Sequence, residues 1–535
     1  MSKKLIKSGL IVSVMTLISR VLGLVRDVVI ANVMGAGVMA DVFLFANKIP
    51  NFFRRLFAEG AFAQAFVPVL SEYHTRDEKN AENSEKAEKI SLDETRRLIA
   101  QASGTLGVII TLVTLFGMLA SPLFVILFGG GWFVDWLNNG PDSVGGEKFE
   151  LAASLLKITF PYLWFISFTA LAGAVLNTLG RFAVAAFTPV LLNIAIIVMA
   201  IYGAEYTQSP AYALAWGVFL GGLIQFLFQI PFLYKANVLV KPRWSWHSKG
   251  VTKIRKLIIP ALFGVSVTQI NLLLDTLIAS FLITGSISWL YYADRLLEFP
   301  LGLFGIGIAT VVLPSLAKLH SKNDSKQFTA TLDWGIRVIS LFGWPALAGL
   351  MVLAQPIIMV LFMRGEFSQT DVLQVSMALF AYLSGLLSFM FIKVLAPGYY
   401  ARQDTKTPVK IGIKAMAANM VFNLMLAPYF GYVGLAMATT LSATLNAWML
   451  YRGLKKAKIY YLSRNTKVFI SKLILAASVM ALVVYQLSDD FGVWLSMSFF
   501  EQILQLVLCI GAGCLSYFLV IFLLGIRLND FNVKS

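Results

Sequence analysis

The chain has 535 residues, of which 58% are hydrophobic and 13% charged, and its formal net charge is +16. This apolar share lies well above that of a soluble domain, so the composition excludes an ordinary water-soluble enzyme or binding module. The positive charge does not indicate nucleic acid binding, because membrane proteins gather Lys and Arg on their cytoplasmic loops.

Apolar runs of about 20 residues, the length that crosses the hydrocarbon core of a bilayer, recur along the whole chain. The first run follows Lys3, Lys4 and Lys7 as a signal peptide would, but it contains two arginines and lacks a small-residue cleavage site, so we expect a retained helix. The runs predict fourteen membrane spans: 8–33, 40–57, 98–127, 151–176, 187–202, 212–233, 257–282, 289–316, 338–362, 373–396, 411–426, 433–451, 468–487 and 503–524.

The loops between these spans alternate in charge, which tests the count because one missed span would invert the pattern. The N-terminus and every second loop after it carry basic residues, whereas the other loops are nearly free of them. Lys148 in the loop 128–150 and Arg364 in the loop 363–371 are the exceptions. The pattern predicts a multi-pass protein with both termini in the cytoplasm.

Short matches in a common order indicate an internal duplication. The segment 66–70 (FVPVL) is similar to 312–316 (VLPSL), and 46–48 falls over 293–295. Six spans per repeat keep the two halves parallel, and transporters built in this way place their site between the halves. We predict an all-α protein with six-helix lobes at 1–236 and 237–458 around a central cavity, followed by two extra helices at 459–535.

Arginines lie within the predicted spans, among them Arg20, Arg26, Arg54 and Arg295. Each would cost roughly 2.5 to 3.5 kcal/mol at the bilayer centre, so we expect them to face a wet cavity that attracts anions. On a straight helix the first two point about 120° apart, and they reach one cavity only if the helix bends or unwinds at Gly23. The alternative is that one or both extend to the membrane interface.

Further charges accompany these arginines. Asp41, Lys48 and Arg55 recur at seven-residue spacing and share one helix face, and Pro50 is expected to kink that helix. Asp294 and Glu298 flank Arg295, which aligns with Lys48 in the duplication. For Asp294, Arg295 and Glu298, local ion pairing is the alternative interpretation.

Polar residues in the later spans suggest a site for a coupling cation. Oxygen ligands suit a hard monovalent ion, whereas interhelical hydrogen bonding is the alternative role. The sequence contains no phosphate-binding Gly-x-x-x-x-Gly-Lys-Ser/Thr motif and only three histidines, so we expect energy from ion gradients or membrane potential, with sodium or a proton as coupling ion and no other cofactor or metal. The candidate ligands are Asp275, Asn419, Asn423 and Thr439.

Four motifs closely resemble the MurJ (MviN) lipid II flippase family: 19–27 (SRVLGLVRD), 51–62 (NFFRRLFAEGAF), 288–300 (SWLYYADRLLEFP) and 394–408 (VLAPGYYARQDTKTP). The resemblance implies the fold of the multidrug/oligosaccharidyl-lipid/polysaccharide exporters, with helices thirteen and fourteen forming a groove for a lipid tail. It also implies a transporter that is not an enzyme. Its substrate would be the undecaprenyl-pyrophosphate-linked peptidoglycan precursor, which moves from the inner to the outer leaflet of the bacterial inner membrane.

The resemblance assigns roles to individual residues. The family's cavity arginines correspond to Arg20, Arg26, Arg54 and Arg295, its acidic cavity positions to Asp41 and Glu59, and its sodium ligands to Asp275, Asn419, Asn423 and Thr439. Asn423 stands where a member of the family carries Asp, which removes a negative charge from the ion site. We expect a monomer that contacts lipid II, membrane lipids and cell-wall synthesis or division proteins.

Two other functions remain as alternatives. A cation-coupled exporter of a drug or a polysaccharide-lipid would share the fold, but it would line its cavity with carboxylates instead of arginines. A membrane glycosyltransferase would need acidic or metal-binding residues on a sizeable loop at the membrane surface, and no predicted outer loop much exceeds twenty residues.

Overall fold

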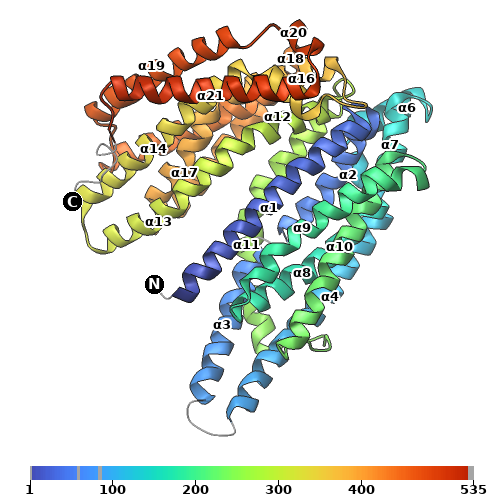
Figure 1. Cartoon of the computed structure of the whole chain (residues 1–535). Helices are drawn as coiled ribbons and strands as arrows, with labels where there is room; N and C mark the ends of the chain where they lie inside the picture. Colours follow the sequence, from blue (N-terminus) through green and yellow to red (C-terminus); the bar gives the residue numbers. More distant parts are fainter. Residues whose placement is uncertain (1–2, 57–60, 82–86, 528–535) are drawn as a thin grey trace. The chain divides into compact units, whose positions relative to one another are not determined.

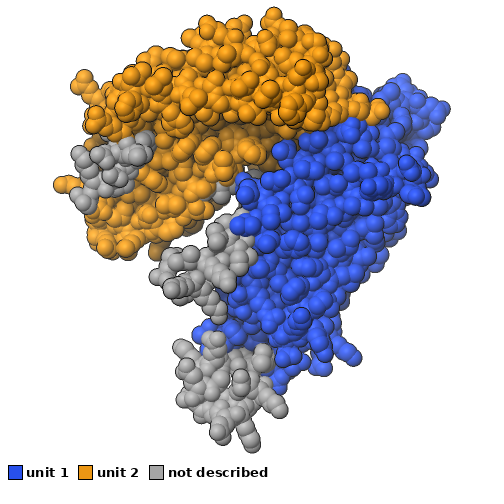
Figure 2. Space-filling view, viewed as in Figure 1, with its two compact units in different colours: residues 1–285 blue, residues 286–535 orange. Residues whose placement is uncertain are grey.

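The computed structural model describes residues 3–56, 61–81 and 87–527, and all regular elements within these ranges are helices (Figure 1). Ten of the described helices are long and apolar enough to cross a membrane. This confirms the predicted all-α polytopic fold, while the count of fourteen spans stays a prediction. The chain forms two compact units, residues 1–285 and 286–535, which Figure 2 colours separately.

Unit 1 contains the first eleven α-helices. The helix pairs α1/α9, α9/α10, α8/α10, α3/α4 and α3/α11 pack against each other most extensively. The helices are α1 (Lys3–Met34), α2 (Val38–Arg54), α3 (Ala61–Ala81), α4 (Ala87–Leu119), α5 (Ser121–Phe128), α6 (Gly130–Asn139), α7 (Val144–Thr159), α8 (Pro161–Thr178), α9 (Phe182–Val198) with short π and 3-10 turns to Tyr206, α10 (Pro210–Lys235) and α11 (Lys249–Ala279).

Unit 2 contains the remaining helices, among which α14 packs on α19 and α19 packs on α21. Its helices are α12 (Ser286–Pro300), a π turn at Leu301–Gly305, α13 (Ile306–Ser321), α14 (Ser325–Val352), α15 (Ala354–Phe362), α16 (Gln369–Leu383), α17 (Leu386–Tyr400), α18 (Lys406–Lys456), α19 (Arg464–Leu487), α20 (Phe491–Ser496) and α21 (Phe499–Leu523).

Several predicted spans are pairs of helices with a short break. The run 151–176 divides into α7 and α8 at Pro161, because proline lacks the N–H that would continue the hydrogen-bond ladder.

Two predicted spans, 411–426 and 433–451, form the two arms of one element, α18. The chain reverses at Gly431, whose φ is 56° and ψ is −136°. Only glycine adopts this combination readily.

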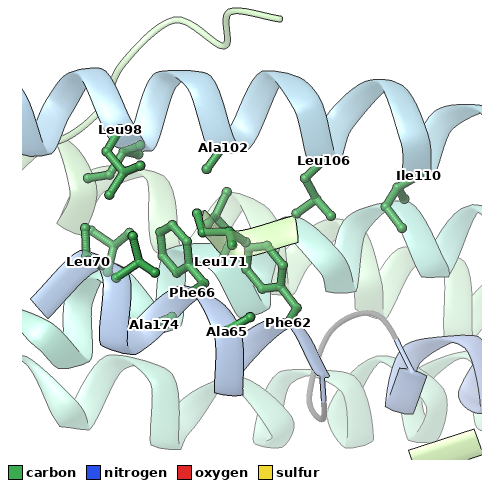
Figure 3. Packing of buried hydrophobic residues seen from close by; sticks show 14 of the residues in the cluster. Phe62, Ala65, Phe66, Leu70, Leu98, Ala102, Leu106, Ile110, Leu171 and Ala174 are labelled. Carbon is green, nitrogen blue, oxygen red and sulfur yellow. The ribbon is translucent and has the colours of Figure 1, made fainter. Parts of the chain in front are cut away.

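One hydrophobic cluster of unit 1 forms where α3 and α4 pack along each other (Figure 3). Phe62, Phe66 and Leu70 follow one another at four-residue spacing on α3, so they share one face of that helix. Leu98, Ala102, Leu106 and Ile110 repeat the same spacing on α4, and Figure 3 shows the two rows of side chains facing each other. Four-residue spacing of apolar side chains thus builds this interface.

The first helix of the predicted second lobe belongs to unit 1, because α11 packs on α3. The division by packing therefore falls after residue 285, whereas the duplication predicts a lobe boundary after residue 236. The predicted lobes stay a prediction about the repeat, and the two units describe how the chain is packed.

The two predicted extra helices, α19 and α21, form their own apolar cluster with α14. The Tyr517 hydroxyl of α21 donates a hydrogen bond of 2.7 Å to the Leu341 carbonyl of α14. Cys509 is buried in this cluster and Cys514 is exposed, and neither forms a disulfide.

Candidate functional site

The charged face of α2 lies against α11, within unit 1. Lys48 donates to the Thr276 hydroxyl over 3.2 Å, and the Arg55 guanidinium donates to the Gln269 side chain over 3.1 Å. Asp41 contacts the chain just beyond the end of α11. Asp41, Lys48 and Arg55, which recur at seven-residue spacing, therefore share one face, as predicted. The helix continues through Pro50 to Arg54.

Asp41 is only 1% exposed, although sequence reasoning placed it on the wall of a wet cavity. Its carboxylate accepts a hydrogen bond of 2.7 Å from the Gly285 N–H and lies 3.4 Å from the Lys148 ammonium group. In this structure Asp41 is a buried, ion-paired residue. Glu59, the second predicted acidic position, lies outside the described residues.

The two arginines of α1 have different surroundings. Arg20 is exposed, whereas the Arg26 side chain is 15% exposed and bonds to Asp27 over 2.7 Å and to the Asn193 carboxamide oxygen over 3.1 Å. The helix is continuous from Lys3 to Met34, so of the two routes by which both arginines could reach one cavity, a bend or an unwinding at Gly23, it does not unwind. The difference follows from the 120° separation that an unbroken helix imposes.

Asn193 of α9 is a functional candidate that sequence reasoning missed. Besides accepting from Arg26, it donates over 3.1 Å to the backbone carbonyl of Ser19, and it is 6% exposed. A neutral carboxamide orients a guanidinium without cancelling its charge. The available signal was a lone Asn within the apolar span 187–202.

The remaining two arginines also have oriented guanidinium groups. Arg54 donates to the Asn51 carboxamide oxygen over 2.9 Å. In unit 2, Arg295 donates to Glu298 and to the Tyr291 hydroxyl over 3.1 Å each, and its guanidinium lies 4.9 Å from the Tyr291 ring centre. Local pairing, left open from the sequence for the Arg295 group, holds for Arg295 with Glu298, a partly exposed pair that contributes little energy. Arg26 pairs with Asp27, which is only 2% exposed.

The four predicted cation ligands fall in both units. Asp275 lies on α11 of unit 1, whereas the other three lie on α18 of unit 2. Asn423 donates to the Asn419 carboxamide oxygen over 3.1 Å, and the Thr439 hydroxyl donates to the Leu435 carbonyl over 3.0 Å. Among the described residues no cluster of His, Cys, Asp and Glu could hold a metal ion.

The hairpin of α18 brings two of these ligands to one level. The Ser442 hydroxyl donates to the Ala415 carbonyl over 2.7 Å, which fixes the register of the two arms. Asn419 lies one turn beyond Ala415, and Thr439 lies about one turn before Ser442, both towards Gly431. The arms therefore place Asn419 and Thr439 at matching heights, with Asn423 one turn further on.

Comparison with known families decides the relationship of the chain. The family described as "Lipid II flippase MurJ" matches residues 30–505. The chain belongs to this MurJ family. A probable lipid II flippase MurJ of Vibrio cholerae is 61% identical over 100% of this chain and 99% of its own length. The Haemophilus influenzae relative of the same description is 58% identical over 97% of this chain and its full length.

Solved structures agree with this assignment. A structure described as lipid II flippase MurJ in an inward closed conformation has a TM-score of 0.76, is 28% identical, and covers 96% of this chain and 98% of its own. An inward-facing multidrug resistance MATE transporter of the MOP superfamily, 16% identical, has a TM-score of 0.64 over 82% of this chain and 96% of its own. The second likeness concerns the fold alone. The MurJ family consists of transporters, so the chain is not an enzyme.

Proposed function

We propose that this member of the MurJ family, a lipid II flippase of the bacterial inner membrane, binds the diphosphate of its substrate on Arg20, Arg26, Arg54 and Arg295. Guanidinium groups suit a diphosphate because each can form two parallel charge-assisted hydrogen bonds. The observation that carries the proposal is the orientation of Arg26 and Arg54 by neutral Asn oxygens, at 3.1 Å and 2.9 Å. Such acceptors fix the direction of the guanidinium group and add no negative charge of their own.

The local carboxylates are compatible with this role. Asp27 and Glu298 hold Arg26 and Arg295 in place when no substrate is bound. A diphosphate brings more negative charge than one carboxylate, and it competes well with the partly exposed Arg295–Glu298 pair. Arg26 keeps its pair with the buried Asp27 and offers its remaining N–H donors to the diphosphate. Transport then proceeds by alternating access, with the headgroup crossing while the lipid tail remains in the bilayer.

The membrane potential supplies part of the driving force in this proposal. An inside-negative potential drives anions outward by about 2.3 kcal/mol per charge per 100 mV. Return of the empty protein is coupled to entry of sodium or a proton at Asp275, Asn419, Asn423 and Thr439. The matching heights of Asn419 and Thr439 on the α18 hairpin support this site.

The sequence supports the proposed orientation in the membrane. The alternation of loop charge supports a multi-pass orientation with both termini in the cytoplasm. We propose that the protein works as a monomer, with cell-wall synthesis or division proteins as its neighbours.

Purified protein in vesicles tests the proposal directly. Fluorescently labelled lipid II is followed from the inner to the outer leaflet while sodium, proton and voltage gradients are imposed one at a time. We expect Arg20→Ala and Arg295→Ala to abolish transport and the exposed Arg452→Ala, which removes the same charge elsewhere, to retain it. Full transport by both Arg20→Ala and Arg295→Ala would refute the diphosphate site.

A further inference from the structure

The single basic residue of the loop 128–150 is a buried cation. Lys148 lies on the second turn of α7 and is 3% exposed. Its ammonium group lies 3.4 Å from the Asp41 carboxylate, 3.1 Å from the Thr284 hydroxyl and 5.5 Å from the ring centre of Trp132. A buried charge is tolerated only when it is paired and hydrogen-bonded, so these contacts account for its burial.

The pair binds two consecutive residues at the end of unit 1. Lys148 donates to the Thr284 side chain, and Asp41 accepts from the Gly285 N–H over 2.7 Å. Gly285 has a φ of +96°, a backbone conformation that favours glycine. We call Asp41, Lys148, Thr284 and Gly285 the junction cluster, because residue 285 is the last of unit 1.

A second contact holds the same segment. The Gly131 N–H donates over 2.9 Å to the Ser280 hydroxyl, and a Cβ at position 131 would meet the Ser280 carbonyl oxygen at 2.3 Å. Segment 280–285, which directly follows α11, is therefore held by residues of α2, α6 and α7. All of these contacts lie within unit 1.

The junction cluster is one end of a series of contacts between α2 and α11. Further along the two antiparallel helices, Lys48 contacts Thr276 and Arg55 contacts Gln269. Asp275, the proposed ion ligand, is adjacent to Thr276. The register of α11 on α2 therefore sets where Asp275 and the α2 cations lie relative to each other.

We infer that Lys148 is a positioning residue: together with Asp41 it fixes the end of α11 on α2 and α7, and so sets the register of the α2/α11 contacts. It touches none of the four proposed substrate arginines through any contact seen among the described residues. The effect of Lys148 on transport rests on the proposed function, whereas the restraint that Lys148 places on segment 280–285 does not.

Hydrogen exchange of the full-length protein in lipid nanodiscs tests the positioning role without substrate. In Lys148→Met, we expect the peptide covering residues 280–288 to exchange about tenfold faster, because the bonds that restrain this segment are lost. Lys148→Arg, which keeps the charge, should restore much of the protection. Glu150→Gln, an exposed charge two residues away on the same helix, serves as the control and should exchange as the parent does.

Thr284→Val is the second variant, because it retains the ion pair and removes only the bond from Lys148 to the end of α11. It should also accelerate exchange of 280–288, and it decides the matter if Lys148→Met does not accumulate as folded protein. Unchanged exchange in Thr284→Val, or in folded Lys148→Met, would overturn the inference.

Transport kinetics separate positioning from substrate contact. Lys148→Met should lower the maximal rate of lipid II transport severalfold at an unchanged KM, since the ligands of the headgroup are intact. A raised KM at a normal maximal rate would overturn the inference and indicate that Lys148 binds substrate itself. Absence of lipid II transport by the parent protein would contradict the proposed function. The hydrogen-exchange result would still test the positioning role of Lys148, because it does not depend on transport.

Discussion

The Trp289 indole N–H donates a hydrogen bond of 2.9 Å to the Asp371 carboxylate in unit 2. Trp289 is the fourth residue of α12, as Asp41 is the fourth of α2, while Asp371 and Lys148 both lie near the start of the helix that packs beside them. The two contacts occupy similar places in their helix pairs, although the predicted duplication sets Asp41 over Ser288, the residue before Trp289. A charge pair joins the helices in one unit, and an aromatic hydrogen bond joins them in the other.

Replacing Trp289 by Phe should destabilise unit 2. Asp371 would keep its bonds to Ser368 but lose the indole donor, and a hydrogen bond to a charged group contributes about 1.5 to 3 kcal/mol. Thermal unfolding of the purified protein measures this loss. The exposed Trp216→Phe provides the comparison, and equal unfolding temperatures for both variants would show that the Asp371 contact contributes nothing.

Asn193→Asp should weaken substrate binding. The new carboxylate would lie beside Arg26 and offset the charge that the diphosphate needs, so we expect the KM for lipid II to rise about tenfold, equivalent to ~1.4 kcal/mol. Transport in vesicles over a range of lipid II concentrations provides the KM. Asn177→Asp adds the same charge at an exposed position and should leave it unchanged. An unaltered KM in Asn193→Asp would exclude Arg26 from the binding site.

Asp404 should make stability dependent on acid pH. Hydrogen bonds from Thr407, including its backbone N–H at 3.0 Å, lower the pKa of this carboxyl below its usual value. A group with a lowered folded-state pKa stabilises the fold above its unfolded pKa of about 4, and that contribution is lost as the pH falls through the folded pKa.

Unfolding temperatures measured between about pH 6 and 3 should therefore fall less steeply for Asp404→Asn than for the parent. Asp142→Asn, an exposed change of the same kind in the loop 128–150, is the matched control. Identical slopes for Asp404→Asn and the parent would contradict the role of the Thr407 contacts.

Gly104→Ala should disrupt the packing of the segment 237–248 on α4. A Cβ at position 104 would lie 2.3 Å from the backbone of Arg243, whose N–H donates to the Ala100 carbonyl over 2.8 Å. Overpacking of this kind costs typically about 1 to 3 kcal/mol. Gly412→Ala on α18 meets nothing within 4 Å and should be neutral or stabilising, so a comparison of unfolding temperatures isolates the clash.

The apolar spans could be read from the sequence, because the length and hydropathy of a run are local properties. The breaks inside them were harder to foresee. Pro161, Gly431 and Pro356, which lies three residues beyond the break at Leu353, accompany three of the breaks. Pro50, by contrast, lies inside α2, which continues to Arg54. Packing of neighbouring helices decides which proline ends a helix, and a pattern within one run does not contain that packing.

The sequence predicted which residues belong to the candidate site, but it predicted their contacts and burial only in part. The shared face of Asp41, Lys48 and Arg55 followed from helical spacing. The burial of Asp41 did not, because its partner Lys148 lies 107 positions away on another helix. The same reason hid Asn193, which is 167 positions from Arg26.

The sequence by itself determined that this is a helical, multi-pass member of the MurJ family, since hydrophobic length and family motifs are written along the chain. Only the tertiary structure decided which groups surround the two basic residues that depart from the loop-charge pattern. Lys148 pairs with Asp41, and the Arg364 guanidinium lies 3.4 Å from the Phe499 ring centre. Both partners come from distant helices, and a charge acquires its role from the groups that folding brings within a few ångströms of it.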